Sequence, residues 1–125
     1  MSETRSAVAE DTVTPWTPER MLMRLGGDEA LAKQLAALFI EECPQMLGRV
    51  RDSLQQTEAD VVRRAAHDFK GSVANFVDGG AAASALELET MGRENNLADA
   101  PQVFARLERE IAALLVDLRR FAESA

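Results

Sequence analysis

The chain has 125 residues, a length that suits one domain with one hydrophobic core. Hydrophobic residues make up 46% and charged residues 28%, which is a globular rather than a disordered composition. The net charge of −7 disfavours binding to nucleic acid or to an anionic membrane surface. No apolar run approaches the roughly 20 residues that span a bilayer, and the N-terminus does not resemble a secretory signal. The single cysteine, Cys43, is expected to be a buried apolar residue in a reducing compartment, so we expect a cytoplasmic protein.

The N-terminal part divides into a tail and a short helix. Residues 1–15 are small, polar and without period, so we expect a flexible tail, with residues 16–125 forming the domain. Trp16 is expected to pack on that domain as an anchor. Thr17 is predicted to be the N-cap of a helix that starts at Pro18 and is stopped by glycines 26–27.

Two further helices are predicted between residues 28 and 56. Asp28 is expected to cap the first of them. Pro44 removes a backbone donor and is expected to end or kink this helix, after which a separate helix runs from Pro44 to about Gln56. The apolar face of the first helix is predicted from spacings of three and four to contain Leu31, Leu35, Leu38, Phe39 and, less regularly, Ala32.

Three more helices complete the predicted fold. They cover residues 58 to about 77, residues 81–91, and residues 99 to about 121, the last with the cleanest amphipathic pattern in the chain. The turn signal at residues 78–80 and Asn95-Asn96 separate them. Short connections favour antiparallel neighbours. The prediction is therefore an all-α, up-down-up-down four-helix bundle with one or two additional N-terminal helices.

The only histidine, His67, lies in the helical stretch 65–76. On a helical wheel it falls roughly 160° from the centre of the apolar stripe, so its side chain is predicted to face solvent. The stripe itself consists of Val62, Ala65, Ala66, Phe69, Val73 and Phe76. The outer face beside His67 carries Arg63, Lys70, Gly71 and Ala74.

These neighbours suit an imidazole that receives a phosphoryl group. A glycine inside a helix costs about 1 kcal/mol relative to alanine, which suggests that Gly71 leaves room for a close approach. Ala74 extends the bare surface, and Lys70 supplies a mobile cation within reach of His67. Lys70 and Arg63 are expected to favour the neutral, nucleophilic imidazole and then to stabilise an attached phosphate.

Other kinds of site are not supported by the sequence. It has no Gly-rich nucleotide loop and no acidic cluster for magnesium, so we expect a phosphoryl carrier rather than an enzyme. One histidine excludes a di-iron bundle, and the chain has too few Cys and His for zinc, so no metal site is expected. Asp68 is adjacent to His67 in sequence and lies on a different face of the helix, so the sequence does not support a Ser-His-Asp triad. The acidic pairs Glu41/Glu42 and Glu87/Glu89 are expected to be solvated faces, as is Arg63-Arg64 unless it serves docking.

Residues 65–76, Ala-Ala-His-Asp-Phe-Lys-Gly-Ser-Val-Ala-Asn-Phe, resemble the histidine-containing phosphotransfer domain. The family pattern is Ala-His-x-Leu-Lys-Gly-Ser-x-Ala-Asn-Leu/Phe, and Phe69 replaces its leucine conservatively. The resemblance covers about residues 21–121. It includes Leu25-Gly26-Gly27-Asp28 upstream and either Leu86-Glu87 or Leu88-Glu89 downstream. The family often has Gly-Ala where this chain has Val77-Asp78, which leaves the helix end open by a residue or two.

The resemblance implies that His67 takes a phosphoryl group from an aspartyl phosphate and passes it to another receiver domain. The partners would be receiver domains of response regulators or of a hybrid histidine kinase, and magnesium would belong to the partner, leaving this chain without a cofactor. A monomer is expected. Lys70 would steady the phosphoryl group, and Ser72, by bonding a carbonyl of the preceding turn, and Asn75 would support the helix. The docking surface would contain Arg63, Arg64, Gly71 and Ala74.

Two alternatives remain open at this stage. The bundle could dock on receivers or kinases as a regulatory interaction module without carrying phosphate. It could also be the phosphotransfer domain of a chemotaxis-type kinase, cut from a longer chain, although the Met1 start favours a free-standing protein.

Overall fold

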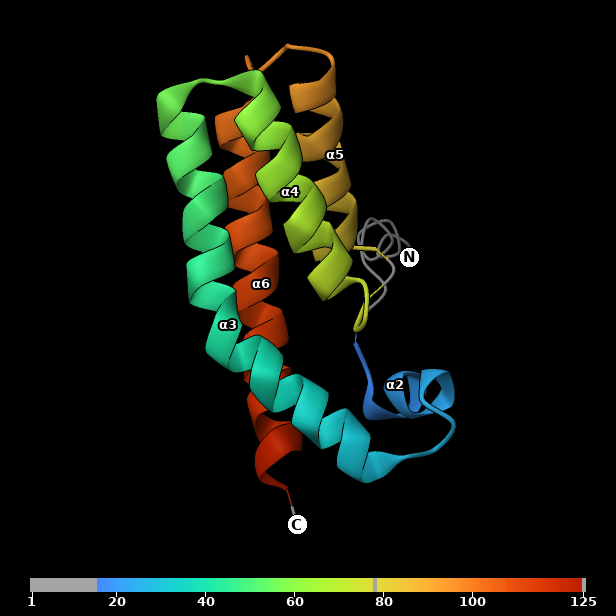
Figure 1. Cartoon of the computed structure of the whole chain (residues 1–125). Coiled ribbons are helices and arrows are strands. Elements are labelled where there is room, and N and C mark those ends of the chain that lie inside the picture. The colour runs from blue at the N-terminus through green and yellow to red at the C-terminus, as the bar shows by residue number, and fades with distance from the viewer. Residues whose placement is uncertain (1–15, 78, 125) are drawn as a thin grey trace, which may run out of the picture.

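The computed structural model describes residues 16–77 and 79–124. This part of the chain is helical and contains no strand. Four helices alternate in direction along the bundle (Figure 1), which confirms the predicted fold class. The tail expected at residues 1–15 lies outside the described residues. The helices are α2 (Pro18–Arg24), α3 (Glu29–Gln56), α4 (Ala59–Val73), α5 (Ala81–Arg93) and α6 (Ala100–Glu123).

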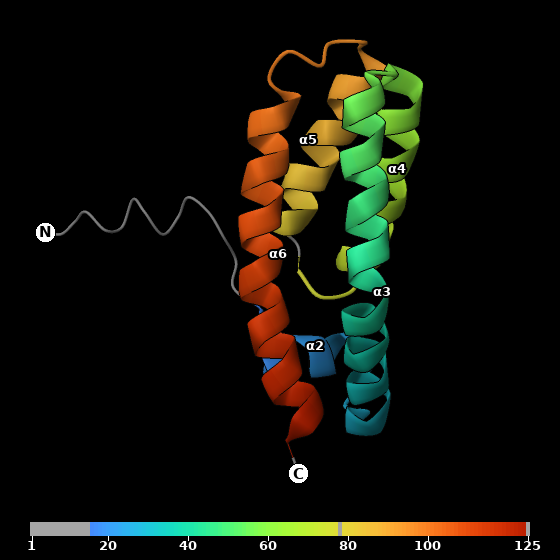
Figure 2. The same cartoon turned by 90° about the vertical axis from the view of Figure 1, so that its left-hand side faces the viewer.

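The four helices of the bundle differ in length, and α2 occupies the space that this difference leaves. Helices α3 and α6 have 28 and 24 residues, whereas α4 and α5 have 15 and 13. Both views show α2 below the ends of α4 and α5, beside the lower half of α3 (Figures 1 and 2). Met21 of α2 is buried, and the guanidinium of Arg24 donates a hydrogen bond to the carbonyl oxygen of Ala74 at 2.9 Å. Helix α2 therefore closes the end of the bundle where α4 stops.

The predicted caps and the tryptophan anchor are present. The Thr17 hydroxyl oxygen accepts a hydrogen bond from the Arg20 N–H at 3.2 Å, and Asp28 Oδ1 accepts one from the Leu31 N–H at 3.0 Å. Trp16 is buried, and its ring lies 5.5 Å from that of Phe121 in an edge-to-face arrangement. Trp16 thus ties the start of the chain to the end of α6.

The prediction of a separate helix beginning at Pro44 was wrong. Helix α3 runs without interruption from Glu29 to Gln56 with Pro44 inside it, and Figure 1 shows the helix bending between its cyan and green halves. A proline in a helix interior costs about 3 kcal/mol. Because α3 packs along both α4 and α6, burial of its apolar face offsets that cost. Among the residues that the structure describes, one additional N-terminal helix, α2, therefore precedes the bundle.

The apolar face of α3 is also rotated from the predicted one. Leu31 and Leu38 are exposed by 38% and 47%, whereas Ala32 and Ala36 are completely buried. The set 32-36-39-43 has spacings of three and four just as the predicted set does, so periodicity cannot separate them. The small alanine side chains let neighbouring helices approach α3 closely.

Helix α4 ends four residues earlier than predicted. It stops at Val73, and a turn follows through Phe76. The side-chain amide of Asn75 donates to the carbonyl oxygen of Ser72 at 3.2 Å, while Phe76 and Val77 are both buried. Both apolar side chains therefore reach the core although the helix ends before them.

Candidate functional site

His67 lies on α4 with its side chain 61% exposed, as the helical wheel predicted. The same helix buries Val62, Ala66, Phe69 and Val73 on its opposite face. His67 Nδ1 lies 3.2 Å from Oε2 of Glu89, a residue of the neighbouring helix α5. One ring nitrogen is therefore held by the protein.

Glu89 is the centre of a polar cluster between α4 and α5. Its side chain is only 7% exposed. Lys70 Nζ forms an ion pair with Oε1 at 2.9 Å, and a terminal nitrogen of Arg93 bonds Oε2 at 2.8 Å. We call His67, Lys70, Glu89 and Arg93 the α4–α5 cluster. In it, one buried carboxylate meets two permanent cations and the imidazole.

The environment of Glu89 keeps it ionised. Burial by itself raises the pKa of Glu89, but contact with the Lys70 ammonium and with His67 outweighs burial, and the pKa lies below its usual value. The expectation of a solvated face at Glu87/Glu89 was therefore wrong for Glu89. The sequence did contain a signal for the burial of Glu89. It follows Ala82 by seven residues and Ala85 by four, a spacing that places all three on the same, buried face of α5.

Gly92 permits the close contact between α4 and α5 on which the cluster depends. A Cβ atom at this position would lie 2.6 Å from both the Ala59 carbonyl oxygen and the Arg63 nitrogen. These are backbone atoms that cannot turn away, so only glycine fits without a shift. The helices consequently approach closely one turn from Glu89 and one turn from His67.

The surface beyond His67 is open, as Gly71 and Ala74 led us to expect. Both residues are exposed, and a Cβ at Gly71 would have no atom within 4 Å outside its own helix. Lys70 differs from the expectation of a mobile cation in solvent. Its side chain is 29% exposed and is directed to Glu89, so its charge is already partly compensated.

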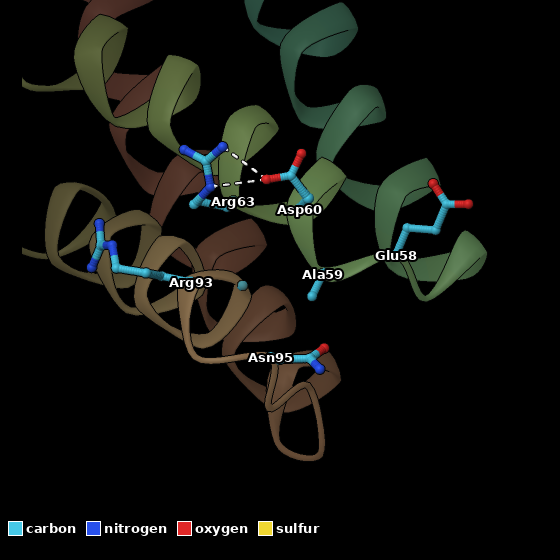
Figure 3. Close-up of a pocket in the computed structure, with 7 residues that line it drawn as sticks. Glu58, Ala59, Asp60, Arg63, Arg93 and Asn95 are labelled. Atoms are coloured by element: carbon cyan, nitrogen blue, oxygen red, sulfur yellow. Dashed lines mark hydrogen bonds and ion pairs between the residues drawn. The ribbon is translucent and has the colours of Figure 1, made fainter.

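Arg63 and Arg64 both lie beside Asp60. Arg63 contacts Asp60 Oδ1 at 2.8 Å, and Arg64 contacts Oδ2 at 3.2 Å. The hydrogen bond from Arg63 is the main reason why the pKa of Asp60 lies below its usual value. Figure 3 shows Arg63 on α4 and Arg93 on α5 lining one shallow hollow, which begins one turn from His67.

The Ser72 hydroxyl has a different partner from the expected one. Its hydroxyl donates to Sδ of Met46 on α3 at 3.3 Å, rather than to a carbonyl of the preceding turn. Asn75 bonds the end of α4, as described above. The hydrogen bonds of Ser72 and Asn75 described here do not involve a residue of the α4–α5 cluster.

A second polar cluster lies on the other side of α5, against α6. The Ser84 hydroxyl is buried and donates to Glu110 Oε1 at 2.5 Å, while Arg106 Nε donates to the Ser84 oxygen at 2.9 Å. Arg106 also pairs with Glu87. We call Ser84, Glu87, Arg106 and Glu110 the α5–α6 cluster.

Within residues 16–77 and 79–124, no three His, Cys, Asp or Glu side chains are grouped so that they could hold a metal ion. In the same part of the chain, every helix is too short or too polar to cross a membrane.

Comparison with known proteins identifies the family. The model of the Hpt domain matches residues 34–117, so the chain belongs to the Hpt family. The chain is also similar to the crystal structure of histidine-containing phosphotransfer protein B (HptB) from Pseudomonas aeruginosa PAO1. That similarity has a TM-score of 0.79 and 27% sequence identity, over 89% of this chain and 97% of that one. No curated protein sequence matches the chain. Family and fold together define a histidine phosphotransfer domain, a phosphoryl carrier of two-component phosphorelays rather than a classical enzyme.

Proposed function

We propose that His67 accepts a phosphoryl group from the aspartyl phosphate of one receiver domain and passes it to the receiver domain of a response regulator. The observation that carries this proposal is the His67–Glu89 pair. The chain has one histidine, its ring is largely exposed, and one ring nitrogen is bonded to a buried carboxylate.

That bond decides which nitrogen is the nucleophile. An ionised carboxylate only accepts hydrogen bonds, so Nδ1 carries the proton in the neutral ring. The lone pair of the neutral imidazole is then on Nε2, the nitrogen that can face a partner. Glu89 thus selects the tautomer and the orientation of His67 at the same time.

The transfer step follows from this arrangement. Nε2 attacks phosphorus and forms the N–P bond, while the P–O bond to the aspartyl carboxylate breaks and the electron pair leaves with that carboxylate. The ring gains a positive charge, which Glu89 stabilises through Nδ1–H. Donation to the next receiver runs through the same steps in reverse.

The remaining residues have supporting roles in this proposal. Lys70 stabilises the phosphoryl oxygens by shifting its partly exposed ammonium from Glu89 toward them. Arg63, Arg64, Gly71 and Ala74 form the docking surface, and Ser72 and Asn75 support the helix. The catalytic carboxylates and magnesium belong to the receiver domain, so this chain needs no cofactor of its own.

A transfer assay tests the proposal. Incubation with a phosphorylated receiver should place an acid-labile label on the protein, and His67→Gln should remove it. Comparing early rates against each receiver of the source organism should identify the partners. If no phosphorylated receiver labels the unsubstituted protein although receivers bind it, the chain is a docking module and the proposal fails.

A further inference from the structure

The three groups that contact Glu89 do not balance its charge. Lys70 and Arg93 carry two positive charges against the single negative charge of the carboxylate. The exposed imidazole therefore lies beside a set of groups with net charge +1. A carboxylate paired with histidine alone would favour the protonated ring, which has no lone pair with which to attack.

Arg93 is placed to counter that effect. It and His67 share the same oxygen, Oε2, at 2.8 and 3.2 Å. Because Glu89 is four residues before Arg93 on one helix, the guanidinium needs no other element to hold it there. The Arg93 side chain is 54% exposed and lines the hollow in Figure 3.

We propose that Arg93 is a positioning residue that holds Oε2 of Glu89 and offsets its charge. Glu89 then orients His67 through Nδ1 without holding the ring in its protonated form. This inference rests on the proposed use of His67 as the phosphoryl acceptor, and it adds a residue that the sequence pattern did not single out.

Among residues 16–77 and 79–124, the charged or titratable side chains in contact with Glu89 come from α4 and α5. Helix α4 contributes His67 and Lys70, and α5 contributes Arg93. On α6, Arg106 and Glu110 belong to the α5–α6 cluster, where both are bonded to Ser84. The Arg63 guanidinium of α4 is bonded to Asp60.

The test uses a reagent that needs no partner protein. Diethyl pyrocarbonate acylates neutral imidazole, and the chain has one histidine and no tyrosine, so the absorbance change reports His67 alone. The rate should be measured against pH for the unsubstituted protein, Arg93→Gln, Arg93→Lys and the control Arg109→Gln. Arg109 is an exposed arginine of α6 that belongs neither to the α4–α5 cluster nor to the docking surface.

In Arg93→Gln, the rise of the rate should move to higher pH by about half to one unit, because one nearby positive charge is lost. The rate at high pH should stay nearly unchanged, and Arg93→Lys should restore the original profile. Arg109→Gln should have no effect on it. Phosphoryl transfer should show the same shift.

An unchanged profile in Arg93→Gln would overturn the proposal, as would an equal loss of rate at every pH with the helical circular dichroism retained. If Arg93→Gln does not fold, Arg93→Lys decides alone, because it must keep the original profile. The acylation profile does not depend on phosphoryl transfer. A shifted profile in a protein that no receiver labels would therefore reject the proposed function and keep the inference about Arg93.

Discussion

The two polar clusters on either side of α5 use similar side chains for different purposes. Each places a carboxylate of α5 and an arginine in contact, and each joins α5 to a neighbouring helix. In the α5–α6 cluster, the hydroxyl of Ser84 is buried among permanently charged groups. In the α4–α5 cluster, the carboxylate is buried and the group it holds is an exposed imidazole.

The comparison teaches that a charged network between helices is not by itself a functional site. The α5–α6 cluster contains no imidazole, and its hydroxyl is buried, so we expect it only to stabilise the contact between helices. The α4–α5 cluster contains the exposed imidazole of His67, and the surface beyond it is open at Gly71. Four predictions test this contrast.

Glu89→Gln should have the largest effect on transfer. A hydrogen bond to a charged group contributes about 1.5–3 kcal/mol, and losing this contribution to the charged, phosphorylated ring corresponds to a rate loss of about tenfold to a hundredfold. The matched variant Glu87→Gln removes a half-exposed carboxylate of the other cluster and should transfer at the normal rate. Early rates from one phosphorylated receiver measure both. Equal rates in the two variants would show that Glu89 does not orient His67.

Alanine substitutions at two glycines should change the free energy of unfolding in opposite directions. At Gly92 the new Cβ would meet the backbone of α4 at 2.6 Å, so Gly92→Ala should lower the free energy of unfolding by about 1–3 kcal/mol. Gly71→Ala adds a methyl group in open space, and it should raise that free energy by up to about 1 kcal/mol. Urea unfolding measures both. A stable Gly92→Ala variant with normal transfer would contradict the close contact of α4 and α5.

Ser84→Ala should lower the stability of the protein without changing the rate of phosphoryl transfer. The buried hydroxyl is bonded to both Glu110 and Arg106, and its loss should cost about 1 kcal/mol of unfolding free energy. Phosphoryl transfer should not change, because the α5–α6 cluster does not contact His67. Slower transfer by a fully folded Ser84→Ala protein would mean that the two clusters communicate through α5.

The buried carboxylate of Glu89 should make the free energy of unfolding depend on pH in the acid range. The pKa of Glu89 in the folded protein lies below its ordinary value of 4.5. Such a group stabilises the fold above its unfolded pKa, and this stability is lost as the pH falls through the folded pKa. The free energy of unfolding should therefore depend less on pH in Glu89→Gln than in the unsubstituted protein, between neutral pH and about pH 3. Glu87→Gln is the control, and identical pH dependence in the Glu89→Gln variant would exclude this contribution.

Much of the fold and part of the site were predictable from local pattern. The capping residues Thr17 and Asp28 act within three residues of chain, and the exposure of His67 follows from helical geometry alone. Pro44 was misread because its local cost is outweighed by packing along a 28-residue helix, which no local rule contains.

The role of Glu89 was missed for a related reason. In sequence it is one of two acidic residues on its helix, 22 positions from His67. Only the close contact that Gly92 permits brings the two side chains within hydrogen-bonding distance.

The helical bundle and the solvent-facing histidine beside a bare surface were predictable from the sequence, because periodicity and composition are properties of single helices. The tertiary structure decided which ring nitrogen is held, which cations surround the carboxylate, and which of the two acidic positions on α5 is buried. Those properties depend on the distance and rotation between α4 and α5. They are set by side chains that pack between the two helices, which local sequence patterns do not contain.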